Sequence, residues 1–248
     1  MIILKSPQEI EKIRASGRIV AGAIEELKTR VRPGIRTKEL DKIAEEFITK
    51  KGGIPAFKGY RGYPNTLCIS VNEEIVHGIP SERILKEGDI VGIDLGVLLD
   101  SYYGDAAVTL PVGHISDKAK HLLETTEVSL YRAIETAVIG RRVSDISHSI
   151  QSCVENAGYS VVREFVGHGI GRSLHEDPPV PNFGEPGKGP QLKEGMVLAI
   201  EPMVNAGGYD LEVLENGWTA VTRDRSLSAH FEHTVAITRN GPLILTMI

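Results

Sequence analysis

Four acidic residues in this sequence stand at the ends of apolar segments that have the composition of β-strands: Asp94, Asp105, Glu201 and Glu232. A charge in such a place is costly unless something compensates it. If Leu99-Asp100 is the tip of a hairpin, Asp94 and Asp105 face each other directly, and they repel unless they share a proton or a cation. A loop cap or a solvated strand end would explain either Asp alone. Two facing acids, matched by two more in the second half of the chain, favour a cation site.

A histidine in a glycine-rich segment completes this set. His168 lies in Val166–Arg172, with a glycine on each side that leaves the imidazole uncovered. A phosphate-binding loop is the alternative, but the spacing is not GxGxxG and no Lys-Ser/Thr follows. Carboxylates with one imidazole suit Mn, Fe(II), Co or Zn. Four carboxylates over-neutralise one ion, so we expect two ions about 3.5–4 Å apart that share bridging oxygens.

The elements that must position these residues can be read from the hydrophobic pattern. Ser6 to Glu9 form a capping box with Pro at the first helical position. Alternating steps of three and four between apolar residues predict helices, and short apolar runs predict strands. The predicted helices cover about 7–31, 37–51, 116–139 and 144–157, and the predicted strands cover 66–71, 90–95, 106–110, 160–165, 196–201 and 234–238.

The order helix, helix, strands occurs twice, and the repetition is also visible in the residues. The segment LKEGDIVGID at 85–94 parallels LKEGMVLAIE at 192–201, and each ends on a carboxylate. Residues 105–110 likewise resemble 232–237, again led by an acid. We therefore expect one α+β domain over 1–248 with an internal near-twofold repeat, its halves at about 1–112 and 113–248. The Pro- and Gly-rich segment 177–189 is predicted to be a surface loop.

Composition excludes several classes of protein. The net charge of −5 gives no basic surface for nucleic acid as a substrate. Two cysteines in 248 residues indicate a protein without disulfides, as expected in a reducing cytoplasm. No apolar stretch approaches the roughly 18 residues that a membrane span needs. We expect a cytoplasmic protein without a membrane partner.

The five residues and their local motifs resemble the pita-bread metalloproteases, and most of all the type I methionine aminopeptidases. The segments CISVNEEIVHGIP (68–80), GHGIGRSLHEDP (167–178) and AIEPM (199–203) carry this resemblance, which extends over nearly the whole chain. It implies a pita-bread fold, in which two pseudo-symmetric ααβ halves form a curved antiparallel sheet covered by helices. It also implies two divalent ions, with Co, Mn, Fe(II) or Zn as candidates.

The resemblance assigns a role to each ligand. Asp94 would hold one ion, His168 and Glu201 would hold the other, and Asp105 and Glu232 would bridge the two. His230 and His233 flank Glu232 in the sequence, and this position makes them candidates for supporting the ligands.

The same resemblance names the groups that would contact substrate. His175 would face the scissile carbonyl oxygen, His77 the peptide nitrogen, and Glu201 would also shuttle a proton. The methionine pocket would be lined by Phe57, Tyr60, Tyr63, Cys68, Leu174 and Trp218. Ordinary packing is the alternative for these apolar residues. Phe57 stands where relatives often have Cys, and Leu174 where an aromatic is often found, which leaves the pocket width and the second-residue preference in doubt.

The expected activity is hydrolysis of the first peptide bond by a hydroxide that two metal ions activate. The substrate would be the N-terminus of a nascent polypeptide with a small second residue, reached by a monomer in transient association with the ribosome. Two alternatives on the same fold remain. An Xaa-Pro-type peptidase usually carries a large added N-terminal domain, and a non-catalytic peptide-binding module usually loses metal ligands, whereas all five are present here.

Overall fold

The computed structural model describes residues 1–248, and its four helices follow the predicted segments. They are α1 (Pro7–Lys28), α2 (Thr37–Lys50), α3 (Asp117–Thr136) and α4 (Val143–Asn156). The predicted capping box starts α1, since the Ser6 hydroxyl accepts from the Glu9 N–H while the Glu9 carboxylate accepts from the Ser6 N–H. The first helix ends three residues before its predicted end at residue 31. None of the four is both long enough and apolar enough to cross a membrane.

Antiparallel strands make up the rest of the fold, in four small sheets. One has the order β1-β4-β2 with β5 paired to β4, a second β15-β14-β9-β7-β8, a third β13-β10-β6 and a fourth β11-β12-β3. The strands are β1 (Ile54–Pro55), β2 (Cys68–Val71), β3 (Glu74–Val76), β4 (Ile90–Leu99), β5 (Tyr102–Pro111), β6 (Ser160–Val161), β7 (Gly167–Gly169), β8 (Glu176–Val180), β9 (Val197–Ile200), β10 (Met203–Asn205), β11 (Leu211–Val213), β12 (Ala220–Thr222), β13 (Ser228–His230), β14 (His233–Thr238) and β15 (Gly241–Ile244).

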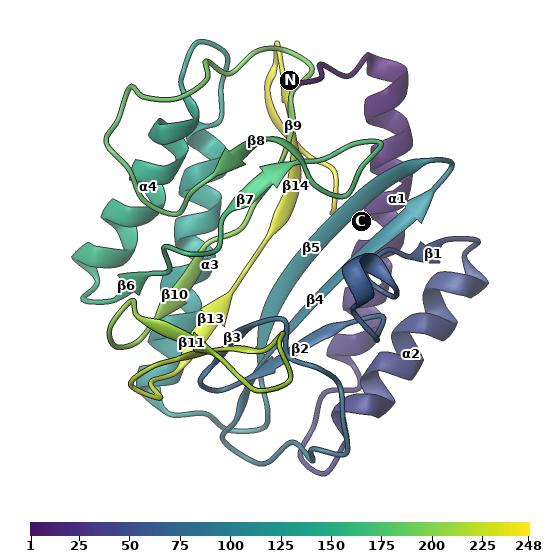
Figure 1. Cartoon of the computed structure of the whole chain (residues 1–248), viewed down its shortest axis with the longest axis vertical. Coiled ribbons are helices and arrows are strands. Elements are labelled where there is room, and N and C mark those ends of the chain that lie inside the picture. Colours follow the sequence, from purple (N-terminus) through teal and green to yellow (C-terminus); the bar gives the residue numbers. More distant parts are fainter.

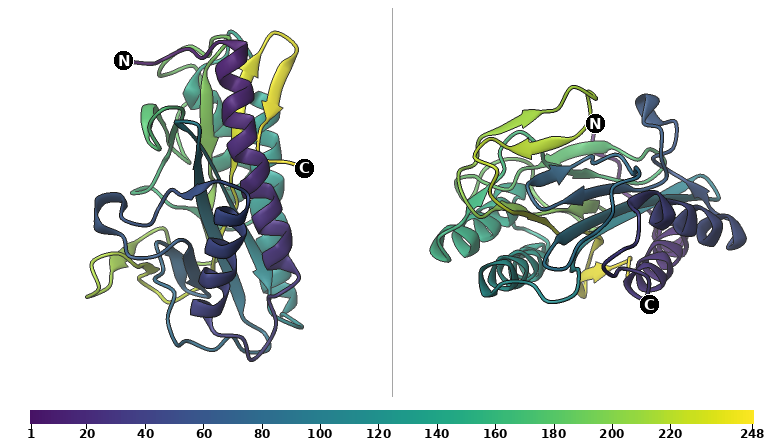
Figure 2. Two further views of the ribbon diagram at one scale, coloured as in Figure 1. Left: turned by 90° about the vertical axis from the view of Figure 1, so that its right-hand side faces the viewer. Right: turned by 90° about the horizontal axis from the view of Figure 1, so that it is seen from below.

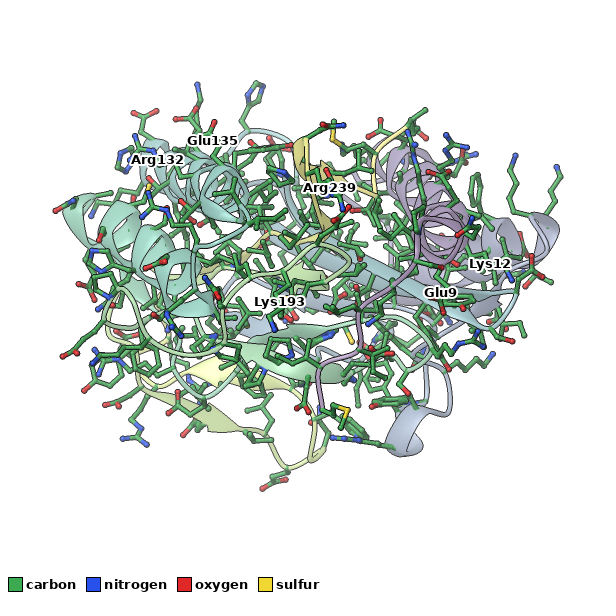
Figure 3. All side chains as sticks on the ribbon, turned by 90° about the horizontal axis from the view of Figure 1, so that it is seen from above. Glu9, Lys12, Arg132, Glu135, Lys193 and Arg239 are labelled. Atoms are coloured by element: carbon green, nitrogen blue, oxygen red, sulfur yellow. The ribbon has the colours of Figure 1, made fainter.

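The helices lie on one side of the sheets, with α1 and α2 next to each other and α3 and α4 next to each other (Figure 1, Figure 2). Each pair covers its own hydrophobic cluster. One cluster contains Leu27 and Leu40 from the first pair, and another contains Leu130 and Ile150 from the second. Charged side chains project outward from these helices, as Lys12 on α1 and Arg132 and Glu135 on α3 illustrate (Figure 3). The predicted α+β class is confirmed.

The hairpin β4–β5 differs from its predicted register. Its two turn residues are Asp100 and Ser101, both with positive φ (48° and 66°), as a two-residue type I′ turn requires. The predicted tip was one residue earlier, so each pairing shifts by two residues. Asp94 faces Ala107, and Asp105 faces Gly96. The two acids are therefore diagonal neighbours rather than directly opposite, although they remain on the same face of the sheet.

Two further predictions are wrong in part. The strand expected over 160–165 stops at Val161, beyond which the chain bends. The segment 177–189 is not wholly a loop, because its first residues belong to β8, which pairs with β7. Both errors arise where the chain turns sharply within a segment that lacks a clear apolar period.

The two ends of the chain meet at a glycine in the first helix. A Cβ on Gly17 would lie 2.4 Å from the Leu245 carbonyl oxygen, and a Cβ on Gly104 would lie 2.9 Å from the Gly17 nitrogen. No larger residue than glycine allows backbones to approach this closely. Helix α1 is thus packed directly on β5 and on the last residues of the chain.

Candidate active site

Five strands or strand ends bring the predicted ligands to one cavity of about 170 Å³. Asp94 lies on β4, Asp105 on β5 and His168 on β7, while Glu201 directly follows β9 and Glu232 directly precedes β14. Hydrogen bonds join β5, in the sheet of β4, to β14 and to Glu232 at this point. The Thr234 hydroxyl donates to the Asp105 carbonyl (2.8 Å), and the Glu232 N–H donates to the Ala107 carbonyl (2.9 Å).

His168 is placed within a strand rather than in an open loop. A Cβ on Gly167 would lie 2.4 Å from the Ala199 carbonyl oxygen, and one on Gly169 would lie 2.2 Å from the Asp177 carbonyl oxygen. The flanking glycines therefore let β7 pack between β8 and β9, and they do not uncover the imidazole, which is 8% exposed. The expectation of an uncovered ring is wrong, because the close backbone approach was not visible in the sequence.

The ring of His168 is oriented for use as a ligand. Its Nδ1 lies 2.9 Å from the Gly169 carbonyl oxygen, which can only accept, so Nδ1 carries the proton and Nε2 is free. Nε2 lies 3.5 Å from Asp105 Oδ2 and 3.6 Å from Glu201 Oε1. One donor atom each from Asp105, His168 and Glu232 lie within 4.8 Å of one another. These distances suit groups arranged around a shared cation.

Burial makes the acid cluster unfavourable in its charged form. Loss of water raises the pKa of Asp94 and of Glu201 to about 8, and nearby carboxylates add to this. The pKa values of Asp105 and Glu232 are raised in the same direction and for the same main reason. Asp94 Oδ1 is buried without a hydrogen-bond partner. Crowded acids with an unpartnered oxygen fit a site for divalent metal ions.

Two more histidines line the same cavity. Burial lowers the pKa of His77 to about 4, with a smaller contribution from His230, and its φ of 61° places its backbone in the left-handed region. His175 lines the cavity and is also exposed to solvent. Burial lowers the pKa of His175, and the adjacent His168, whose ring centroid is 4.2 Å away, lowers it further. Both rings are therefore neutral near pH 7 and can donate a hydrogen bond without carrying charge.

Tyr60 and the segment around residue 176 orient His175. The Tyr60 hydroxyl lies 2.9 Å from His175 Nδ1. On the other side, Glu176 Oε1 accepts from the N–H groups of Arg172 (2.8 Å) and Ser173 (3.2 Å). The second oxygen of Glu176 pairs with Lys5 Nζ at 2.5 Å, and the two side chains are 7% and 3% exposed. A residue from before the first helix thus fixes the loop that carries His175, which the sequence pattern did not reveal.

All six residues predicted for the methionine pocket line this cavity: Phe57, Tyr60, Tyr63, Cys68, Leu174 and Trp218. Gly96 makes room for the first of them, since a Cβ there would lie 2.8 Å from Phe57 Cε1. The Tyr63 hydroxyl lies within hydrogen-bonding distance of two backbone carbonyls, those of Leu67 and Gly78. Sequence reasoning missed Arg61, which also lines the cavity beside Tyr60.

The two histidines that flank Glu232 differ in position. His230 points its Nε2 toward Glu201 Oε2 at 3.5 Å. His233 contacts Thr246 through Nδ1 at 2.9 Å and lies beside Tyr131, and it does not line the cavity. Only His230 is placed to support the ligands.

Comparison with known proteins gives a consistent result. The model of metallopeptidase family M24 matches residues 11–239. The chain is 59% identical to methionine aminopeptidase 1 of Bacillus subtilis, over the full length of both. It superimposes on the crystal structure of methionine aminopeptidase from Thermotoga maritima with a TM-score of 0.99 and 48% identity, again over both full chains. A prolidase from Pyrococcus furiosus matches with a TM-score of 0.81 and 27% identity, but the chain covers 66% of it. The predicted pita-bread fold is confirmed by these neighbours.

Proposed function

This chain belongs to metallopeptidase family M24, and we propose that it is a metal-dependent aminopeptidase that removes the initiator methionine from nascent proteins. The observation that carries the proposal is the convergence of five metal-ligand residues on a cavity whose other wall is apolar. The Xaa-Pro alternative is weaker, because the prolidase neighbour is 27% identical to the chain, whereas the two methionine aminopeptidases are 48% and 59% identical. The binding-module alternative is weaker because no ligand has been lost.

The five residues would together hold two divalent ions. Asp94 would hold one ion, His168 and Glu201 would hold the other, and Asp105 and Glu232 would be shared between them. Bound ions of this kind supply an activated water and polarise the scissile carbonyl. The donor set suits Mn, Fe(II), Co and Zn alike, so cellular supply decides among them.

The chain's own residues do the rest. The apolar wall takes the methionine side chain, with the Cys68 sulfur as a soft contact for the thioether. Neutral His175 donates to the carbonyl oxygen as negative charge develops there, and neutral His77 contacts the peptide nitrogen. The Glu201 carboxylate takes a proton from water and returns it to the leaving nitrogen.

Substrate choice follows from the lining of the cavity. Apolar residues lie beside the metal-ligand residues, so the methionine side chain can pack against them while the first peptide bond lies at the metal centre. The aromatic side chains of Tyr60, Tyr63 and Trp218, which line the cavity, favour a small second residue. The transient ribosome association, the monomeric state and the cytoplasmic location stay predictions.

A peptide panel combined with metal analysis tests this function. Protein purified without oxygen should hold two equivalents of metal and release methionine from Met-Ala-Ser. It should act poorly on Met-Leu-Ser, Ala-Ala-Ser and Ala-Pro-Ser. Activity confined to Ala-Pro-Ser would support an Xaa-Pro peptidase. A protein that stays inert after addition of Mn, Fe(II) or Co would support the binding module.

A further inference from the structure

Arg61 is the only lysine or arginine among the residues that line the cavity. The other charged residues there are the four acids of the proposed metal site. Its guanidinium forms no ion pair and no side-chain hydrogen bond, whereas Lys58 in the same segment pairs with Glu45 at 2.6 Å. The N–H donors of Arg61 are therefore available to a ligand.

The backbone fixes the place from which this side chain extends. A short turn over Tyr60–Gly62 is closed by two hydrogen bonds, from the Gly59 N–H to the Tyr63 carbonyl (2.8 Å) and from the Tyr63 N–H to the Tyr60 carbonyl (2.9 Å). Within this turn Arg61 has φ 50° and ψ 23°, a conformation that few residues other than glycine adopt. Such backbone strain is concentrated at binding and catalytic sites.

A series of stacked groups relates Arg61 to the metal site. Its guanidinium carbon lies 5.4 Å from the centroid of the Tyr60 ring. The Tyr60 ring is stacked on His175 at 5.3 Å, and the His175 ring lies 4.2 Å from that of His168. Burial and His168 lower the pKa of His175, and the positive charge of Arg61 lowers it further. The guanidinium is thus near the group that would face the scissile carbonyl.

These spacings indicate which substrate residue Arg61 can reach. Two contacts, of 5.4 and 5.3 Å, separate its guanidinium from the His175 ring. An extended polypeptide advances roughly 3.3–3.6 Å per residue, so the two contacts span at most about three residues. Arg61 is exposed as well as lining the cavity, so it can meet a polypeptide that leaves the cavity for solvent. The third residue of the substrate is the first beyond the one that packs beside the aromatic side chains.

We propose that Arg61 is a specificity-determining residue that recognises an acidic third residue of the substrate. This inference rests on the proposed aminopeptidase function. A guanidinium binds a carboxylate through two parallel N–H···O bonds, and it repels a lysine or arginine in the same place. Because the pair would be exposed to solvent, we expect a preference of about 2- to 5-fold that decreases with salt.

Three peptides that differ only at the third residue test the proposal. We would measure kcat and KM of the metal-loaded, full-length protein for the C-terminal amides of Met-Ala-Glu-Ser, Met-Ala-Gln-Ser and Met-Ala-Lys-Ser. The amide leaves the glutamate as the only carboxylate of the first peptide. The value of kcat/KM should be highest for Glu and lowest for Lys. The difference should lie in KM, because the contact is made equally in the bound substrate and in the transition state. It should nearly disappear at about 1 M NaCl.

Two variants and a matched control assign the preference to this residue. Arg61→Asn removes the charge, and Asn tolerates the left-handed backbone better than most residues. It should process the Glu and Gln peptides with equal kcat/KM. Arg61→Asp should prefer Lys to Glu. Lys58→Asn removes an exposed cation that does not line the cavity, and it should keep the wild-type order.

The outcomes separate this inference from the function on which it rests. Release of methionine from all three peptides with equal kcat/KM would overturn the role of Arg61 and leave the proposed function intact. A preference for Glu that persists in Arg61→Asn, or that is lost in Lys58→Asn, would also overturn it. Failure to release methionine from any of the peptides would instead refute the proposed function. If Arg61→Asn does not fold, the order of the peptides with the wild type at low and high salt decides.

Discussion

The buried ion pair between Lys5 and Glu176 gives the sharpest test of how the site is held together. Lys5→Met removes the ammonium and keeps most of the side-chain volume. Glu176 then remains buried, with two backbone N–H donors but without its cation. Removal of one partner from a buried pair costs about 3–5 kcal/mol, because the remaining charge is uncompensated. For a domain of this size the loss corresponds to a fall in Tm of about 6–20 °C.

A surface pair provides the matched control. Lys58 Nζ lies 2.6 Å from Glu45 Oε1, close to the 2.5 Å of the buried pair, but these side chains are 49% and 39% exposed. Lys58→Met should therefore cost no more than about 1 kcal/mol. The comparison varies burial while the residue type and the distance stay almost the same.

The assay is urea unfolding of the metal-free variants, together with kcat and KM for Met-Ala-Ser. We expect Lys5→Met to lower kcat with unchanged metal content, because the loop that carries His175 is released. Lys5→Met combined with Glu176→Gln should recover part of the free energy of unfolding, since no buried charge remains and the amide oxygen can still accept from Arg172 and Ser173. If Lys5→Met costs no more than Lys58→Met, the reasoning from burial is refuted.

Three further predictions concern the site itself. Asp105→Ala should lose bound metal, whereas His175→Ala should keep it and lower kcat by about 10²- to 10³-fold. Metal analysis together with steady-state kinetics checks this prediction. Full metal content and full activity in Asp105→Ala would disprove the bridging role. Because burial raises the pKa of Asp94 and Glu201 to about 8, metal-free protein at pH 7 carries protons on these groups that binding must displace. Affinity should therefore rise with pH up to about 8 and more than one proton should be released at pH 7, as calorimetry in buffers of different ionisation heat would show; affinity that is flat from pH 6 to 8 would contradict the assignment. The pKa of His77 is lowered from 6.5 to about 4, so the unfolded chain binds a proton in this range that the folded protein does not, and stability falls as the pH drops from 6.5 to 4. In metal-free protein His77→Gln should show a shallower fall than the wild type, and parallel urea-unfolding curves for the two would rule this cause out.

The parts of this molecule that could be predicted from sequence are those with a local pattern. The capping box at Ser6 and the apolar stripe behind it predict α1. The apolar runs that end on Asp94 and Glu201 predict that β4 and β9 bring these two acids to the site. The predicted register of β4–β5 was wrong, because the register depends on the backbone conformation of Asp100 and Ser101. A shift of one residue in the turn changes which residues face each other, while the composition of the strands is unchanged.

What escaped prediction depends on contacts between distant residues. Nothing in the sequence around Lys5 or Glu176 indicates a pairing, and only the fold reveals that they form a buried ion pair. The three-residue strands β10 to β13 are too short to show alternation, so the sequence names His230 and His233 as candidates but does not tell which of them faces Glu201. Arg61 was missed for a similar reason, because nothing in a Gly- and Tyr-rich loop indicates which side chain turns toward a cavity.

The contact between Gly17 and Leu245 has a consequence for how the protein is made. A chain leaves the ribosome with its N-terminus first, yet Gly17 of helix α1 packs against Leu245, which is synthesised much later. Strand β5, which carries Asp105, is likewise made long before β14 and is joined to it only when β14 has been synthesised. Contacts between such distant segments form late, because long loops must close first. We infer that the metal-binding centre does not form before Glu232 and β14 have been synthesised.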